Sequence, residues 1–255
     1  MWQTFAVLAV MVFVAMLVVV ALRRFPLPAD ATMAPEPSSF LITFRAALLL
    51  LYCVSLAGFT GLPTSWVMYT VWNFTLQAIY YGWAIAYQWR HRHSRASQCM
   101  TKEGRILSMF FDVCFSVSFL VCLVFWTVVL PSNPAIDLNW NTCLQHAGNV
   151  VFLVVEFAFN GRSVRASSLG YVLLLPLVYG ILSWIGHETW RKGFWPYQFL
   201  DVSAPLSPAW YLGVCLVHSV FLFGAIGLTK LKWRVRPVSV VDAVEDVHTP
   251  KDNYV

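Results

Sequence analysis

Residues 106–130 read ILSMFFDVCFSVSFLVCLVFWTVVL, and this stretch decides the class of protein. It contains one charged residue, Asp112, and it exceeds the roughly 20 apolar residues that a helix needs to cross a bilayer. The whole chain has the same character, since 59% of its 255 residues are hydrophobic and 11% are charged. Soluble domains contain about 25% charged residues, so this chain has too little charge to cover a water-facing surface. We therefore predict an integral membrane protein.

Six other stretches are candidate spans, and the fifth and sixth spans along the chain are the shortest and carry the most polar or helix-breaking residues. The expected spans run over residues 2–22, 40–60, 64–87, 106–130, 142–159, 168–185 and 209–229. The sequence therefore predicts an all-α membrane bundle of about seven transmembrane helices. We divide it into an extra N-terminal helix with a Pro-rich linker (residues 1–39), a six-helix core (residues 40–230) and a polar tail (residues 231–255).

The positions of Lys and Arg predict the orientation, because cytoplasmic loops carry an excess of both. With the N-terminus outside, the cytoplasmic side holds Arg23, Arg24, Arg90, Arg92, Arg95, Lys102, Arg105, Arg162, Arg165, Lys230, Lys232, Arg234, Arg236 and Lys251. The outer side holds only Arg191 and Lys192, and Arg45 lies within a span. We predict an N-terminus outside and a C-terminus in the cytoplasm, in either the endoplasmic reticulum or the plasma membrane. The basic loops then lie against anionic lipid, and we expect no nucleic-acid partner.

Polar residues recur along one face of two spans, and such residues are functional candidates because burying them in a membrane is costly. The third span carries Thr70, Asn73, Gln77 and Tyr80, and the fifth carries His146, Asn149, Glu156 and Asn160. We expect both faces to point into the bundle. They serve either helix–helix hydrogen bonding or catalysis.

The expected topology places Thr70 and His146 at similar depth below the outer surface, since each lies a few residues inside a span that enters from that side. His187 closes the sixth span on the same side, and His218 lies in the outer half of the seventh. In the inner half, Arg45, Asp112 and Glu156 share a similar depth and predict an ion-paired cluster. This cluster is either a structural brace or part of a proton or ion path.

The six cysteines include no C-x-x-C pair, which argues against a disulfide framework or a zinc site. We expect no metal and no cofactor.

Three quoted stretches carry a resemblance to a known family. They are Met68–Gln77 (MYTVWNFTLQ), His146–Glu156 (HAGNVVFLVVE) and Trp195–Asp201 (WPYQFLD), followed by Lys230–Trp233 (KLKW) at the end of the last span. In this order they resemble the androgen-induced protein family, which includes the androgen-dependent regulator of tissue-factor-pathway inhibitor. The rolling-stone membrane proteins look similar over the same stretches. The resemblance covers about residues 40 to 235.

The resemblance implies a multipass threonine hydrolase that cleaves fatty acid esters of hydroxy fatty acids. The family's threonine falls on Thr70 and its histidine on His146, with Glu156 as the Glu that follows ten residues later. Cys143 stands where the characterised enzymes carry a second histidine. In such an enzyme His146 activates the Thr70 hydroxyl, and the sequence leaves Asn73, Asn149, His187 and His218 as candidates for contacting the substrate or the oxyanion.

Other classes of membrane protein remain in competition with this hypothesis. A seven-span receptor shares the topology, but the sequence has no Asp-Arg-Tyr after the third span and no Asn-Pro-x-x-Tyr in the last. A retinal protein needs a lysine midway along its last span, and Lys230 lies at the end. The main alternative is a non-catalytic membrane protein of the rolling-stone type, acting in adhesion, fusion or signalling.

Overall fold

The structure is a computed structural model that describes residues 2–27, 39–58, 65–92 and 100–235. Most of the predicted Pro-rich linker and of the polar tail lies outside the described residues. Within the described ranges the chain is helical and forms no strands, so the predicted all-α membrane bundle is confirmed.

Nine α-helices follow one another through the described residues. They are α1 (Trp2–Arg24), α2 (Ser39–Ala57), α3 (Tyr69–Arg90), α4 (Lys102–Val124), α5 (Leu130–Ser132), α6 (Trp140–Cys143), α7 (Asn149–Phe159), α8 (Leu169–Glu188) and α9 (Ser207–Val235). Two π-helical turns, η2 (Phe125–Val129) and η3 (Leu144–Gly148), join α4 to α5 and α6 to α7 without a break. Short 3₁₀ turns lie at η1 (Ser65–Val67), η4 (Ala166–Ser168) and η5 (Gln198–Leu200).

Six of these continuous helices are long and apolar enough to cross a membrane, counted over the described residues. They are Trp2–Arg24, Ser39–Ala57, Lys102–Ser132, Trp140–Phe159, Ala166–Glu188 and Ser207–Val235. The chain is therefore a multipass membrane protein. The remaining expected span, residues 64–87, corresponds to α3, which is 22 residues long but less apolar because its buried face is polar. A count of seven spans, and the orientation of the termini, stay predictions.

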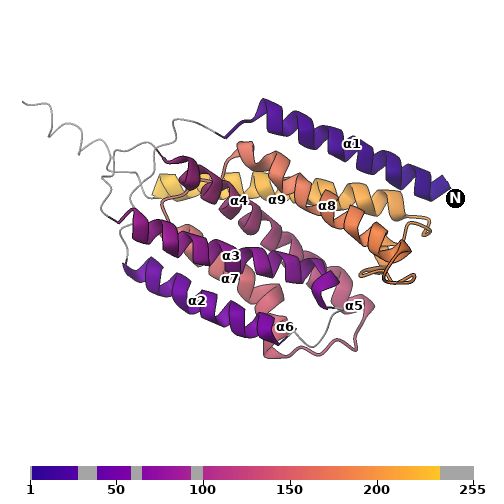
Figure 1. The fold of residues 1–255 in the computed structure, drawn as a ribbon, viewed down its shortest axis with the longest axis horizontal. Helices are drawn as coiled ribbons and strands as arrows, with labels where there is room; N and C mark the ends of the chain where they lie inside the picture. Colours follow the sequence, from indigo (N-terminus) through magenta and orange to yellow (C-terminus); the bar gives the residue numbers. More distant parts are fainter. Residues whose placement is uncertain (1, 28–38, 59–64, 93–99, 236–255) are drawn as a thin grey trace, which may run out of the picture.

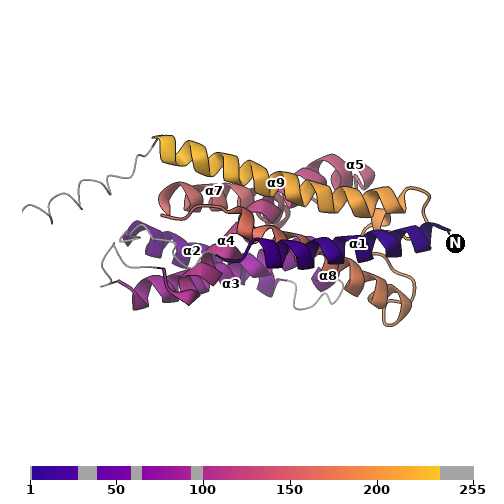
Figure 2. The same cartoon turned by 90° about the horizontal axis from the view of Figure 1, so that it is seen from above.

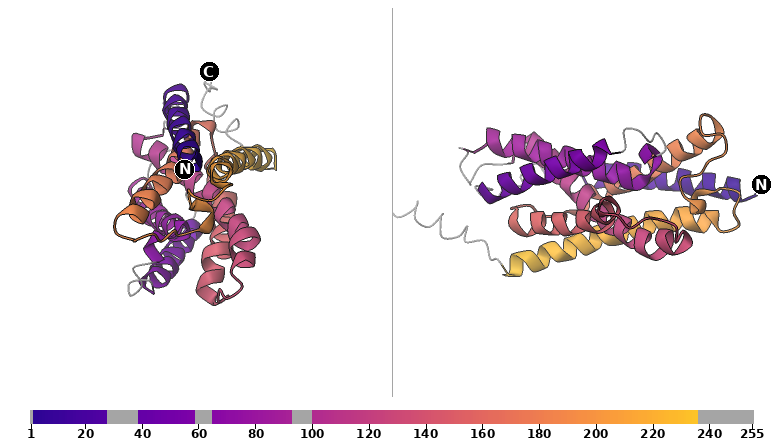
Figure 3. Two further views of the ribbon diagram at one scale, coloured as in Figure 1. Left: turned by 90° about the vertical axis from the view of Figure 1, so that its right-hand side faces the viewer. Right: turned by 90° about the horizontal axis from the view of Figure 1, so that it is seen from below.

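The long helices run roughly along one axis (Figure 1 and Figure 2), and the end-on view in Figure 3 shows them gathered into a bundle. α3 packs between α2 and α4, and α4 packs in turn against α9. α1 lies against α8 and α9, so the first span is part of the same bundle. The division of the chain at residue 39 stays a prediction.

The helices turn apolar side chains outward and polar side chains inward. On α1, Phe5, Phe13 and Met16 are exposed, as expected of a helix that faces lipid. On α3, Asn73 and Gln77 are completely enclosed. The prediction that the polar faces point into the bundle is confirmed for α3 and for Asn149 and Glu156 on α7.

Candidate active site

A cavity of about 440 Å³ lies inside one half of the bundle. Its walls come from α1, the start of α3, the junction of α4 with η2, the turn η3, α8, α9 and the segment 196–200. Most of the lining is apolar, and only a few side chains offer hydrogen-bonding groups. An apolar hollow with few convergent polar groups is typical of a ligand site.

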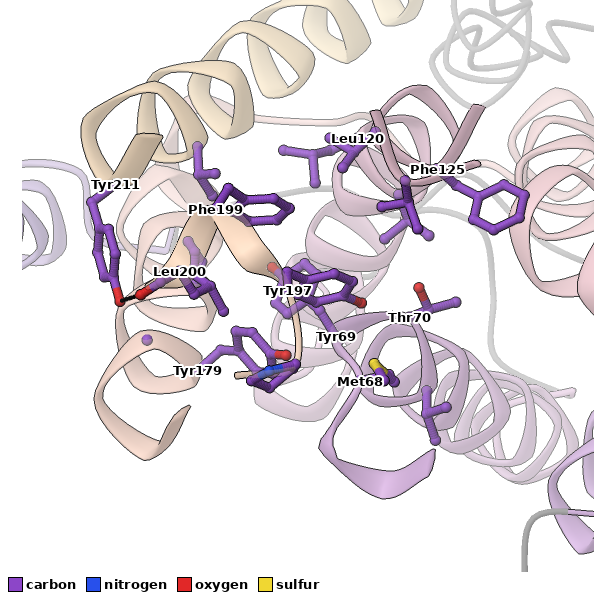
Figure 4. A pocket seen from close by; sticks show the side chains of 18 of the residues that line it. Met68, Tyr69, Thr70, Leu120, Phe125, Tyr179, Tyr197, Phe199, Leu200 and Tyr211 are labelled. Atoms are coloured by element: carbon purple, nitrogen blue, oxygen red, sulfur yellow. Dashed lines mark hydrogen bonds between the residues drawn. The ribbon is translucent and has the colours of Figure 1, made fainter. Parts of the chain in front are cut away.

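Thr70 lines this cavity from the first turn of α3. The helix begins at Tyr69, and Met68 before it supplies no side-chain cap, so the first N–H groups of α3 need partners other than a capping side chain. The Thr70 side chain is only 8% exposed and lies at the cavity wall in Figure 4. A hydroxyl in this position can meet a ligand in the cavity while remaining shielded from lipid.

His146 lines the same cavity from the π-helical turn η3. Its Nδ1 lies 2.8 Å from the carbonyl oxygen of Thr142. Because a carbonyl only accepts, Nδ1 must carry the proton, and neutral His146 keeps a lone pair on Nε2. The ring also stacks on Phe125 with the centroids 3.5 Å apart. His146 therefore has the tautomer and the fixed position that a general base needs.

Phe125 begins the other π-helical turn, η2. The stacking of Phe125 on His146 therefore brings the two π turns of the described residues together at the cavity. The Trp126 indole nitrogen donates to the backbone oxygen of His146 at 3.3 Å, which joins the two turns further. Single π turns inside α-helices occur frequently at functional sites. Cys143, three residues before His146, is exposed, and the His146 ring contacts the Thr142 carbonyl and Phe125.

One hydrogen bond fixes the register between α3 and α7. The Tyr80 hydroxyl donates to Glu156 at 2.7 Å across a sequence separation of 76 residues. The same separation joins Thr70 to His146, and α3 packs against η3. Thr70 and His146 each lie ten residues before a member of the Tyr80–Glu156 hydrogen bond, and His146 lies in a π turn, whose rise per residue differs from that of an α-helix. That the two residues share one depth stays a prediction.

Four tyrosines line the cavity, and the hydroxyl groups of three of them contact a backbone carbonyl or a histidine. Tyr179 and Tyr211 donate to backbone carbonyl groups at 2.8 and 3.0 Å. Tyr69 lies 2.7 Å from Nε2 of His218. Nδ1 of His218 contacts a backbone oxygen at 2.7 Å, so Nε2 accepts the Tyr69 proton. His218 is fully buried behind the cavity wall and holds Tyr69 in place.

The fourth tyrosine, Tyr197, was not among the candidates that the sequence suggested. It lies in the WPYQFLD stretch, and its ring points toward Thr70 (Figure 4). No helical periodicity covers this segment, so spacing alone gave no signal. Only its place in a family-like stretch could have singled it out.

The remaining candidates of the outer half do not line the cavity. Asn149 is buried, and its side-chain oxygen accepts from the Val150 N–H at 2.6 Å. Asn73 is buried with neither side-chain polar atom bonded to another described residue. His187 stacks on Trp195 with centroids 4.2 Å apart, at the far end of α8. The structure therefore brings together Thr70 and His146 and places these three elsewhere.

In the other half of the bundle, Arg45 pairs with Glu156. The Arg45 Nε lies 3.1 Å from both carboxylate oxygens, and one terminal nitrogen donates to Gln88 at 2.6 Å. Both side chains of the ion pair are fully buried. Tyr80 bonds the same carboxylate. The predicted pairing of Arg45 with Glu156 is confirmed.

Asp112 has other partners. Its carboxylate accepts from the Ser168 hydroxyl at 2.6 Å and from the Arg165 N–H at 3.2 Å. These bonds tie α4 to the turn before α8. The predicted three-residue cluster is thus divided into two sets, because Asp112 faces the 160–168 connection and Arg45 faces α3 and α7.

The fold and the cavity together define a multipass helical membrane protein with a mostly apolar cavity inside the bundle. A family model described as "FAR-17a/AIG1-like protein" matches residues 61–231. The chain belongs to this family, the androgen-induced protein family. The match includes α3, η3 and the WPYQFLD stretch. Searches of curated proteins and of solved structures found no match.

Proposed function

We propose that this protein hydrolyses lipid esters, such as fatty acid esters of hydroxy fatty acids, with Thr70 as the nucleophile and His146 as the general base. The observation that carries the proposal is that Thr70 and His146, 76 residues apart, line one apolar cavity. Membership of the androgen-induced family supports the same assignment.

Thr70 and His146 take the roles of nucleophile and general base that acyl transfer requires. A threonine hydroxyl is a weak nucleophile and needs a base within hydrogen-bonding reach. His146 presents Nε2 as the acceptor because Nδ1 is held by the carbonyl oxygen of Thr142. His146 accepts the Thr70 proton as Thr70 attacks the ester carbonyl, and then donates it to the departing alcohol. Water attacks the acyl-Thr70 ester in the second half, with His146 again as the base.

The cavity supplies the remaining requirements of a lipid hydrolase. Its apolar walls suit an acyl chain, and its place inside a membrane bundle lets a lipid enter from the bilayer. The polar groups lie at one level, near the start of α3 and at η3. The ester group is therefore expected at this level, with the hydrocarbon chains against α1, α4 and α8.

Turnover and covalent labelling of purified protein in detergent test the proposal. We expect wild-type protein to hydrolyse a fatty acid ester of a hydroxy fatty acid and to react with a fluorophosphonate probe at Thr70, located by peptide mass spectrometry. Thr70→Ala should lose both activities. His146→Ala should lose nearly as much, because the nucleophile and base act as a unit.

Thr75→Ala is the matched control. Thr75 lies on the same helix, but its hydroxyl donates to the Val71 carbonyl at 2.8 Å and lies outside the cavity lining. This variant should keep both turnover and labelling. If folded wild-type protein neither turns over the ester nor takes up the probe, the hydrolase proposal fails. The non-catalytic alternative of the rolling-stone type then replaces it.

A further inference from the structure

Tyr197 is the tyrosine of the cavity whose hydroxyl faces the proposed nucleophile. Tyr69, Tyr179 and Tyr211 direct their hydroxyl groups to His218 or to backbone oxygens. The Tyr197 hydroxyl lies over the first turn of α3, toward Thr70 (Figure 4). The hydroxyl groups of the other three tyrosines thus have partners other than Thr70, whereas that of Tyr197 hydrogen-bonds with Thr70.

The surroundings of Tyr197 keep its hydroxyl protonated and directed. Burial raises the pKa of Tyr197, and hydrogen bonding with the Thr70 side chain and with the backbone of Thr70 and Tyr69 offsets part of that rise. A phenol with a raised pKa remains a hydrogen-bond donor at neutral pH. Pro196, whose ring restricts the backbone, precedes it and also lines the cavity. The ring packs against Phe199 with centroids 5.1 Å apart.

The proposed hydrolysis needs a hydrogen-bond donor close to Thr70. When Thr70 attacks, the carbonyl oxygen of the ester gains a full negative charge, and donors already aimed at it lower the barrier. Asn73 and Asn149 do not line the cavity, so the two amides that the sequence suggested are not in contact with it. Tyr197 lines it and faces Thr70.

We propose that Tyr197 is a catalytic residue that donates a hydrogen bond to the oxyanion of the tetrahedral intermediate, the former carbonyl oxygen of the ester attacked by Thr70. The inference rests on the proposed hydrolase function. In the first step a bond forms between the Thr70 oxygen and the acyl carbon, and the Thr70 proton moves to Nε2 of His146. The carbonyl electron pair moves onto oxygen, which accepts from the Tyr197 O–H. When the intermediate collapses, the alcohol leaves with the proton from His146, and Tyr197 keeps its own proton throughout.

The test is Tyr197→Phe, which removes one oxygen atom and keeps the ring. Loss of one oxyanion donor lowers kcat by about 100- to 1000-fold in other enzymes, so we expect a fall in kcat of about 100-fold with KM little changed. The rate of fluorophosphonate labelling should fall as well, because the probe forms a similar anionic centre on Thr70. The Tm should fall by no more than about 2–4 °C, as expected for one lost hydrogen bond.

Tyr52→Phe is the matched control. The Tyr52 hydroxyl is buried and donates to Gln77 at 2.7 Å, but Tyr52 does not line the cavity. Its removal should lower the Tm by about 2–4 °C, as expected for one lost hydrogen bond, and leave kcat unchanged. The two variants should thus have a similar Tm, and only Tyr197→Phe should lower kcat.

The results separate this inference from the proposal on which it rests. If wild-type protein is active and Tyr197→Phe retains the kcat and labelling rate of wild type, Tyr197 is not an oxyanion donor and the hydrolase proposal stands. If Tyr197→Phe loses activity only in proportion to a loss of folded protein, its role is structural and the inference is refuted. If wild-type protein shows no activity and no labelling, the hydrolase proposal itself has failed.

Discussion

The buried ion pair between Arg45 and Glu156 allows a quantitative prediction. Both side chains have no exposed surface, and the Arg45 Nε contacts both carboxylate oxygens at 3.1 Å. Arg45→Ala leaves Glu156 charged inside the bundle with Tyr80 as its closest remaining donor, at 2.7 Å. Removing one partner of a buried pair costs about 3–5 kcal/mol, because the other charge stays buried without compensation.

Thermal unfolding in detergent measures this loss. For a chain of this size, 3–5 kcal/mol corresponds to a fall in Tm of roughly 6–20 °C. Adding Glu156→Gln to Arg45→Ala should restore part of the lost Tm, since the Gln side chain offers Tyr80 a hydrogen-bond acceptor without a buried charge.

The control is Arg90→Ala. Arg90 pairs with Glu103, but its side chain is 55% exposed and that of Glu103 is 27% exposed, so its loss should cost about 0–1 kcal/mol. If Arg45→Ala and Arg90→Ala have the same Tm as wild type, the ion pair does not brace the bundle.

Two further predictions concern α1. Met11 lines the cavity, so Met11→Trp should reduce the turnover of long-chain esters by about tenfold or more. Short-chain esters should react as in wild type. Equal losses for both kinds of ester would show that α1 does not limit the length of the acyl chain. At Gly170, an added Cβ would lie 2.7 Å from the Leu22 side chain and 3.2 Å from its backbone nitrogen. Gly170→Ala should therefore separate α1 from α8 and cost about 1–3 kcal/mol, measured as a lower Tm. Gly213→Ala, where a Cβ meets nothing within 4 Å, should leave the Tm unchanged or raise it, and a similar result at Gly170 would contradict the close packing.

Much of the candidate site was predictable from the sequence because depth in a membrane is a one-dimensional quantity. The ends of the spans and the rise per residue place Thr70 and His146 at one level. Periodicity assigns the polar residues of α3 to one helix face, and a polar face must turn away from lipid. The same argument grouped Arg45 with Asp112 and Glu156, since a charge in the membrane interior needs a partner.

The sequence by itself determined the class of protein, the helical bundle and the buried faces, because the length of the apolar stretches and the helical period can be read directly from the chain. Only the tertiary structure decided which faces meet. It directed Asp112 to the 160–168 connection, placed α1 at the cavity wall and brought Tyr197 from a connecting segment onto the first turn of α3. It also held His146 by the Thr142 carbonyl and the Phe125 ring. The physical reason is that helical periodicity fixes the direction of a side chain relative to its own helix, whereas its neighbours depend on how the helices pack around it.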